Sequence, residues 1–109
     1  MFYISLSSYD YKTVKSAVEQ IILALMRGSK ECKVDCITNA YFHIENIDDM
    51  YLEISLCDIE GHMISDDKFS MYLCDITADK ITAIIMSMMS EYMQALYVDT
   101  LRYYGKMEA

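Results

Sequence analysis

The sequence predicts an α+β fold in which an antiparallel sheet of three to four strands carries two helices on one face, in the order β-α-β-β-β-α. Two segments repeat apolar residues at helical spacing. Shorter segments alternate apolar and polar residues, as half-buried strands do. The chain has 109 residues, the size of one domain, so residues 1–109 are expected to form a single compact domain.

The first third of the chain predicts a strand followed by a helix. Residues 2–7 alternate apolar and other side chains, which is a short strand pattern. Ser8 and Asp10 are suitable N-cap residues. From Tyr11 onward apolar residues recur every three or four positions, which predicts a helix of about 17 residues. Gly28 fits the position just after its end, because glycine adopts positive φ without strain.

The middle of the chain predicts three strands joined by polar turns. Residues 34–44, 51–57 and 69–75 alternate apolar and polar side chains. Residues 45–49 and 58–61 are rich in acids, asparagine or glycine and predict turns. The sheet face covered by both helices would carry Phe42, Leu52, Ile54, Leu56, Met71 and Leu73. The opposite face would be open, as antiparallel sheets permit, and would carry Asn39, Tyr41, His43, Tyr51, Glu53 and Tyr72.

A long second helix is predicted at the C-terminal end. Thr77 is a suitable N-cap, and Asp79 would lie in the first turn. The helical pattern begins at Ile81 and runs to about Tyr104, just before Gly105. Such a helix is about 40 Å long, whereas a strand spans about 20 Å. Part of it should therefore extend beyond the sheet, pack on the first helix, or meet a second copy.

The four cysteines are expected to be free thiols. Structural zinc sites favour a C-x2-C pair, and no such pair occurs among Cys32, Cys36, Cys57 and Cys74. The acids that begin at Asp58 also lack the glycine and the glutamate that a calcium-binding EF-hand loop needs. We therefore expect no metal and no cofactor.

No motif indicates a catalysed reaction. The sequence lacks a phosphate-binding glycine loop, a G-x-S-x-G nucleophile motif and an H-E-x-x-H metal motif. His43 and Cys57 on the open face would be the minimum for a thiol nucleophile. One histidine and one cysteine on neighbouring strands are more often two half-exposed residues with no catalytic role. The sequence therefore predicts that the protein is not an enzyme.

Negative charge is concentrated in the middle of the chain. Seventeen acids and nine bases give a net charge of −8. Residues 34–79 hold eleven acids and one base, Lys68, which is a local net charge of −10. This charge repels nucleic acid and anionic membranes, so neither is an expected direct partner, whereas a basic protein surface would attract it.

The predicted partner-binding surface combines the acids of the sheet and turns with the tyrosines of the open face. Tyrosine gives a large contact area and has few rotatable bonds that lose freedom on binding, which suits an interface. The predicted residues are Tyr41, Glu45, Asp48, Asp49, Tyr51, Glu53, Asp58, Glu60, Asp66, Asp67 and Tyr72. Two alternatives stay open: turns attract Asp and charge aids solubility, and aromatic residues often pair across strands.

In size, charge and expected architecture the chain is similar to the small acidic inhibitors that phages and other mobile elements carry against bacterial defence nucleases, including anti-CRISPR proteins. The similarity is one of general character and depends on no motif. It implies a nucleic-acid-mimicking inhibitor that blocks a basic surface of a nucleic-acid-binding protein, such as a CRISPR effector nuclease.

The alternative is a self-associating scaffold or adaptor that forms a homodimer through the long second helix. That helix is rich in methionine, which suits adaptable contacts, and Met86 and Met93 are expected to be its exposed pair. Residues 1–12 lack the basic start and apolar core of a secretory signal. No apolar run approaches the roughly 20 residues of a membrane span. A cytoplasmic protein is therefore expected.

Overall fold

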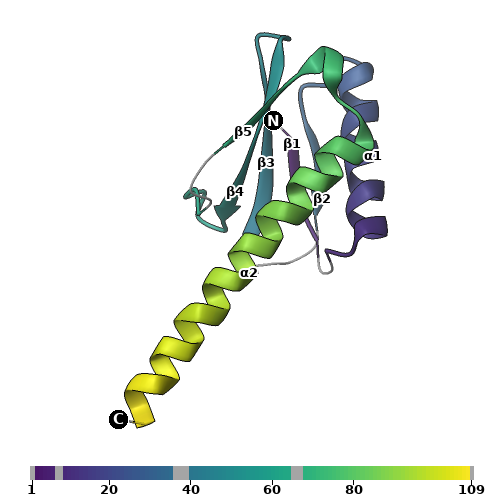
Figure 1. Ribbon diagram of the computed structural model, residues 1–109. Helices are drawn as coiled ribbons and strands as arrows, with labels where there is room; N and C mark the ends of the chain where they lie inside the picture. Colours follow the sequence, from purple (N-terminus) through teal and green to yellow (C-terminus); the bar gives the residue numbers. More distant parts are fainter. Residues whose placement is uncertain (1, 7–8, 36–39, 65–67, 109) are drawn as a thin grey trace.

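The computed structural model of the chain describes residues 2–6, 9–35, 40–64 and 68–108 (Figure 1). In the last helix, side chains are described as far as Gln94. The elements are β1 (Phe2–Ser5), α1 (Tyr11–Met26), β2 (Cys32–Asp35), β3 (Ala40–Ile47), β4 (Tyr51–Asp58), β5 (Phe69–Tyr72), a 3-10 turn (Leu73–Asp75) and α2 (Ala78–Glu108). The α+β class predicted from the sequence is confirmed.

The sheet is mixed and has five strands in the order β2-β1-β3-β4-β5. β1 pairs with β2 in parallel, and the other neighbours are antiparallel. The predictions of three to four antiparallel strands and of the order β-α-β-β-β-α are therefore wrong. The alternation over residues 34–44 predicts one strand, but β2 ends at Asp35 and β3 begins at Ala40. Parallel neighbours need a long crossover, and α1 lies between β1 and β2.

The last strand is shorter than the alternation predicts. β5 ends at Tyr72, and residues 73–75 form a 3-10 turn. The Leu73 N–H donates to the Met50 carbonyl oxygen at 2.9 Å. This bond ties the chain to the turn between β3 and β4 before it enters α2.

Both ends of α1 and the start of α2 agree with the predicted caps, but the predicted end of α2 at Gly105 is wrong, because the helix continues to Glu108. The Thr13 N–H donates to the Asp10 carboxylate at 2.8 Å, so Asp10 is the N-cap of α1. Gly28 has a φ of +75°, and the Ser29 N–H donates to the Ala24 carbonyl oxygen at 2.9 Å, as in a Schellman motif. The Lys80 N–H donates to the Thr77 hydroxyl oxygen at 3.2 Å, which caps α2.

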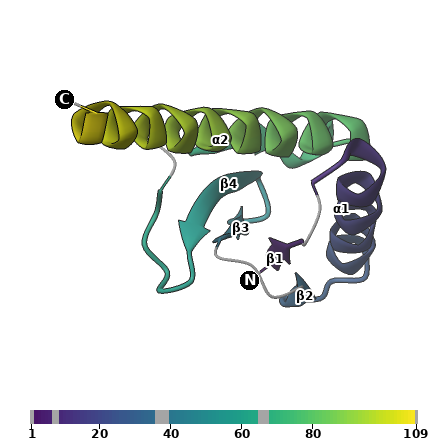
Figure 2. The same cartoon turned by 90° about the horizontal axis from the view of Figure 1, so that it is seen from below.

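Both helices contribute to the core on one face of the sheet. Figure 2 shows α1 beside β1 and β2, and α2 running across the β3–β4 side. Phe42, Leu52, Ile54 and Leu56 are buried there, as predicted, with Met71 partly buried. Leu73 packs against the core from the 3-10 turn and not from a strand. The helices add Val14, Ala17, Val18, Ile21, Ile81, Ile85 and Met88 to this core.

The helices are joined to each other through Asp79. Its carboxylate accepts a hydrogen bond from the Tyr11 hydroxyl at 2.6 Å and lies 3.1 Å from the Lys15 ammonium. The hydrogen bond from Tyr11, followed by the one from Lys15, holds the pKa of Asp79 below its usual value. This contact fixes the first turn of α2 on the first turn of α1.

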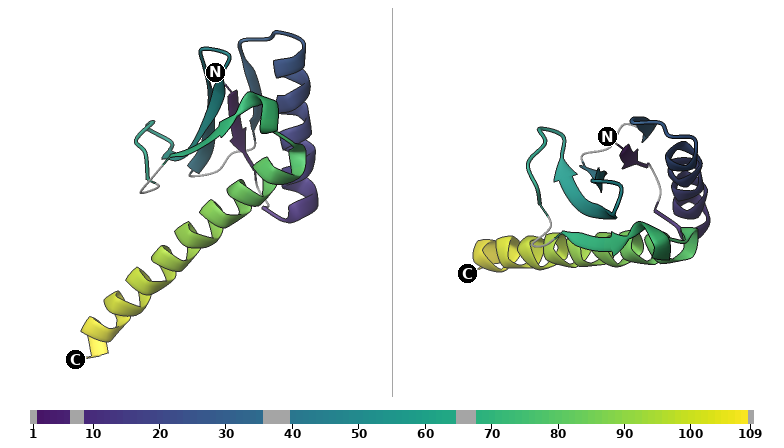
Figure 3. Two further views of the ribbon diagram at one scale, coloured as in Figure 1. Left: turned by 45° about the horizontal axis from the view of Figure 1, so that its top comes forward. Right: turned by 90° about the horizontal axis from the view of Figure 1, so that it is seen from above.

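The second half of α2 extends beyond the sheet. Among the described side chains, Tyr92 is the last that packs against the core, yet the helix backbone continues to Glu108. Sixteen further residues extend by about 24 Å. Figures 1 and 3 show this extension, and the molecule measures 57 × 25 × 23 Å. Two of the predicted alternatives therefore hold, since α2 packs on α1 and also overhangs. No helix in the described part of the chain is long and apolar enough to cross a membrane.

Candidate functional site

The sheet face that points away from the helices carries all three predicted tyrosines, Tyr41, Tyr51 and Tyr72. Strand register places Tyr41 opposite Cys57, His43 opposite Ser55, and Tyr51 opposite Tyr72. These residues alternate with core residues and therefore share the open face. Asn39, Asp66 and Asp67 lie outside the described residues.

The middle of this open face is an aromatic patch. The ring of Tyr3 meets Tyr41 edge-on at 5.4 Å and stacks on His43 at 5.5 Å between ring centres. The Lys33 ammonium lies 5.7 Å from the centre of the Tyr3 ring. Burial lowers the pKa of His43 and raises the pKa of Tyr41. Both effects favour the neutral side chains of His43 and Tyr41.

Cys57 lies beneath this face and not on its surface. It is only 6% exposed, and its sulfur is 3.9 Å from the Ser55 hydroxyl oxygen. His43 and Cys57 do share one face, as expected. The burial of the thiol leaves a substrate little access to it.

The turn between β3 and β4 holds two acids in an unusual backbone conformation. The Met50 N–H donates to the Ile47 carbonyl oxygen at 3.0 Å, which closes a tight turn with Asp48 and Asp49 at its centre, and the strand register pairs Ile47 with Tyr51. Asp48 and Asp49 both have positive φ, 54° and 55°, as the I′ turn type requires. The Asn46 side chain accepts from the Asp49 N–H at 3.1 Å and donates to the Asp49 carboxylate at 2.9 Å. Asn-Gly would adopt this turn with less strain.

Two more acids face each other beside this turn. Glu45 on β3 is the direct cross-strand partner of Glu53 on β4. Like charges directly opposite each other destabilise a sheet. The Lys68 ammonium lies 3.6 Å from Glu53 and offsets part of this repulsion. Four carboxylates therefore lie near one end of the β3–β4 hairpin.

Exposed apolar and aromatic groups lie beside these acids. Met50 is 61% exposed and Tyr72 is 62% exposed. A shallow hollow of about 390 Å³ is lined by Met50, Tyr51, Glu53, Ser70, Met71 and Tyr72. A second hollow, of about 520 Å³, is lined in part by Lys30, Glu45, Asp48 and Asp49. We call the seven residues Glu45, Asp48, Asp49, Met50, Tyr51, Glu53 and Tyr72 the hairpin-end surface.

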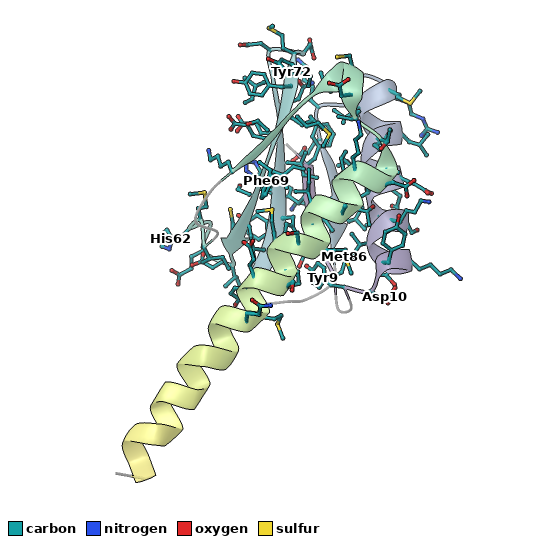
Figure 4. The ribbon with its side chains drawn as sticks, in the orientation of Figure 1. Tyr9, Asp10, His62, Phe69, Tyr72 and Met86 are labelled. Atoms are coloured by element: carbon teal, nitrogen blue, oxygen red, sulfur yellow. The ribbon has the colours of Figure 1, made fainter. Side chains whose placement is uncertain are left out.

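The other described residues of the predicted site lie at the opposite end of the hairpin. Asp58 is seven residues from Tyr51 along β4, a separation of about 23 Å. Tyr41 and Glu60 belong to the Asp58 end, because Tyr41 pairs with Cys57 and Glu60 follows in the turn. Figure 4 shows the same separation, with Tyr72 near one end of the sheet and His62 near the other. The predicted site is therefore two separate groups.

Asp58 has a structural role in its own turn. One of its carboxylate oxygens accepts hydrogen bonds from the Glu60 and His62 N–H groups, both at 2.9 Å. The bond from His62, followed by the bond from Glu60, keeps the pKa of Asp58 below its usual value. The Gly61 N–H donates to the Asp58 carbonyl oxygen, and Gly61 has a φ of +90°, so the predicted turn is confirmed.

No metal centre is evident in the part of the chain that the structure describes. It contains no group of three His, Cys, Asp or Glu side chains placed to share an ion. Cys32, Cys57 and Cys74 are free thiols, and Cys36 lies outside the described residues.

Two contributors to the open face were missed from the sequence. Met50 follows the acids of the turn directly, and an apolar residue in so polar a turn was the available signal. Tyr3 was assigned to a strand but not to the face, because alternation within residues 2–7 does not reveal that β1 pairs with β3 beside Tyr41 and His43.

Comparison with known proteins adds no relative. The chain matches no protein-family model, and it matches neither a curated protein nor a solved structure. The function of the hairpin-end surface is therefore argued from its chemistry alone.

Proposed function

We propose that the protein is a non-enzymatic inhibitor whose hairpin-end surface occupies a basic surface of a nucleic-acid-binding protein. One observation carries the proposal: four carboxylates lie together where the local structure favours other residues. Asp48 and Asp49 hold positive φ, and Glu45 opposes Glu53. Residues that oppose local stability are expected at functional sites.

The chemistry of the surface suits a basic groove. Carboxylates accept two parallel hydrogen bonds from an arginine side chain, as phosphates do. Exposed Tyr72 and Met50 provide apolar contact beside the charges. Charges around apolar contact residues of this kind speed association and exclude wrong partners. The surface can therefore compete with a nucleic-acid backbone for the same arginines and lysines.

The partner class follows from the sign and density of the charge. The net charge of −8 disfavours direct contact with nucleic acid or an anionic membrane. CRISPR effector nucleases hold their nucleic acids in positively charged channels, and other defence nucleases present comparable basic surfaces. The general similarity to phage-borne acidic inhibitors supports the same class of partner.

A matched pair of variants tests whether the position of the acids matters. The site variant E45Q/D48N/D49N/E53Q removes four charges from the hairpin-end surface. The control variant E19Q/E31Q/D75N/E91Q removes four charges from exposed residues elsewhere. Pull-downs from nuclease-treated bacterial lysate are compared for the parent and both variants. Basic nucleic-acid-binding proteins should be captured by the parent and the control, and lost with the site variant.

A competition assay then tests inhibition. Labelled DNA or RNA bound to the captured protein, or to purified CRISPR effector nucleases, is followed by fluorescence anisotropy. The parent should displace the nucleic acid, and the site variant should not. Equal displacement by the site variant, or equal loss with the control, would rule out the hairpin-end surface as the inhibitory site.

The alternative role as a scaffold uses a different part of the molecule. It depends on the portion of α2 that extends beyond the sheet. Self-association there does not compete with the hairpin-end surface.

A further inference from the structure

The strand β5 forms one edge of the sheet, and its residues are exposed there. Among the described residues it pairs with β4 alone, because it is the last strand in the order β2-β1-β3-β4-β5. Three of its four residues, Phe69, Ser70 and Tyr72, are exposed. Figure 4 shows the side chains of Phe69 and Tyr72 along this strand. A free edge of this kind can pair with a further strand from another chain.

The two edges of the described sheet differ in chemistry. The opposite edge, β2, carries an exposed lysine, Lys33, and lysine is a common protection of free edges. Residues Phe69–Tyr72 include no charged residue and no proline. Both strands are short, which also limits unwanted pairing. However, β5 adds two exposed aromatic side chains, Phe69 at 41% and Tyr72 at 62%, so it is the edge that is suited to a partner.

The alternation of ladder bonds identifies the backbone groups that face this edge. The Leu73 N–H donates to the Met50 carbonyl oxygen at 2.9 Å, and the same register pairs Glu53 with Ser70. Hydrogen-bonded and non-hydrogen-bonded pairs alternate along an antiparallel ladder, so the Glu53–Ser70 pair is of the non-hydrogen-bonded kind. The N–H and the carbonyl oxygen of Ser70 therefore point away from β4, as does the Tyr72 N–H.

The hollow beside this edge is suited to a long basic side chain. Its volume is about 390 Å³, and it is lined by Met50, Tyr51, Glu53, Ser70, Met71 and Tyr72. Ser70 is small, so a side chain on an added strand can pass over it to the Glu53 carboxylate. The stems of arginine and lysine pack on apolar surface while their charged groups reach further. The rings of Tyr51 and Tyr72 attract cations as well.

The charge around the hollow favours a cation. Glu53 lies directly opposite Glu45, and the Lys68 ammonium, 3.6 Å from Glu53, is the one base within residues 34–79, whose net charge is −10. Arginine suits this site better than lysine, because it binds a carboxylate through two parallel hydrogen bonds and stacks on aromatic rings.

We propose that an extended segment of the partner adds to β5 as a sixth strand and places an arginine opposite Ser70, with its guanidinium group in the hollow beside Glu53. The choice of a basic protein as the partner rests on the function proposed above. Because strand side chains alternate between faces, the residues on either side of this arginine lie on the same face as Phe69 and Met71, where apolar side chains fit. The segment therefore has an arginine between two apolar residues.

A second copy of this chain is a poorer occupant of the edge. Each copy has a net charge of −8, so two copies repel each other. The described part of α2 also offers less apolar surface for self-association than the sequence predicts. Met93 is 57% exposed, but Met86, which was expected to be exposed with it, packs partly against the core.

An NMR titration of the full chain with short peptides tests the edge directly. The probe Ser-Val-Arg-Val-Ser should shift the backbone amide signals of Ser70 and Tyr72 at concentrations up to about 1 mM. N-methylation of the arginine should weaken binding at least about tenfold, because that N–H faces Ser70. N-methylation of the first valine should have a much smaller effect, because its N–H faces away from β5. Equal effects of the two methyl groups, or no shift with the unmethylated probe, would overturn the proposal.

A proline in the protein gives a second test. S70P removes the N–H that points outward and leaves the ladder bonds to β4, and proline is tolerated on edge strands at such positions. S70A is the conservative comparison, because it keeps this N–H. S70P should unfold within about 3 °C of S70A and should bind the probe at least about tenfold more weakly than S70A does. Equal binding by the two variants would contradict strand addition at β5, and the methylated peptides decide the case without any change to the protein.

Partner capture separates this inference from the proposed function. If the parent and S70P capture the same basic proteins equally while E45Q/D48N/D49N/E53Q captures none, strand addition is wrong and the proposed function stands. If the probe binds as predicted but the parent captures no basic protein, the edge recognises arginine and the proposed function fails. A parent dimer that S70P abolishes, together with no binding of the probe, would assign the edge to a second copy and overturn the proposal.

Discussion

Asp48 and Asp49 carry the clearest conflict between local structure and residue choice. Both have positive φ at the centre of the tight turn that the Met50 N–H closes on Ile47, where asparagine and glycine are preferred. The Asn46 side chain supports the turn through two hydrogen bonds to Asp49. The turn forms despite its two acids, which is consistent with a role for their charge.

Replacing both acids by the preferred turn residues separates stability from binding. D48N/D49G should raise the free energy of unfolding by about 1 kcal/mol, because the strain at positive φ is relieved. Urea denaturation measures this change. The same variant should lose partner capture, since two charges are removed. A destabilised variant would show that the acids serve the turn itself.

For single residues, the sequence predicted the sheet face of a side chain better than it predicted the contacts that the side chain makes. Alternation placed Tyr51 and Tyr72 on the same face correctly, because side chains of a strand alternate. It did not reveal that Asp58 accepts hydrogen bonds from its own turn, or that Asp79 joins the helices. Those roles depend on backbone geometry and on contacts 68 residues apart.

Between elements, the β3–β4 ladder contains a repulsion that one substitution should remove. E45K places a cation opposite Glu53 and should raise the free energy of unfolding by roughly 0.2–1 kcal/mol. E45Q removes the repulsion without adding attraction, so it should fall between the parent and E45K. Urea denaturation of the three proteins gives the order. An E45K variant less stable than the parent would indicate that the two glutamates do not repel each other in the folded state.

The contact of Asp79 between α1 and α2 predicts that folding stability depends on pH in the acidic range. The Tyr11 hydroxyl and Lys15 hold the pKa of Asp79 below its ordinary 3.8. A carboxyl with a depressed folded pKa stabilises the fold above its ordinary pKa, and this contribution is lost as pH falls through the folded value.

D79N tests this contact through its pH profile. The variant should be less stable than the parent near neutral pH, and the difference should shrink as pH falls below about 3.8. Urea denaturation from about pH 2 to pH 6 measures both profiles. D75N, at an exposed acid without this contact, serves as the control. A constant difference across the range would contradict the role of the Asp79 charge.

The strand that the sequence could not place is β2. Its four residues Cys32–Asp35 are too short for a clear alternation. Its partner is β1, with Phe2 aligned to Cys32, so the pairing depends on a contact 30 residues apart. The helices and the antiparallel β3–β4 pair depend on local periodicity and turns, and these were predicted.

For the whole molecule, the sheet domain should fold without the end of α2. Among the side chains that the structure describes, every buried core residue lies at or before Met88. A chain that ends at Gln94 should therefore unfold within about 3 °C of the full-length chain. Thermal unfolding monitored by circular dichroism at low micromolar concentration checks this. A large drop in the unfolding temperature would show that residues 95–109 support the domain.

The proposed function requires that the position of the four acids of the hairpin-end surface, and not total charge, makes the molecule an inhibitor. The direct measurement is the affinity for a captured basic partner as a function of salt, for the parent, E45Q/D48N/D49N/E53Q and E19Q/E31Q/D75N/E91Q. We predict that the site variant binds weakly with a shallow salt dependence, while the control keeps the parent's affinity and most of its slope. Equal losses in both variants would contradict the claim, because they would show that bulk negative charge alone attracts the partner.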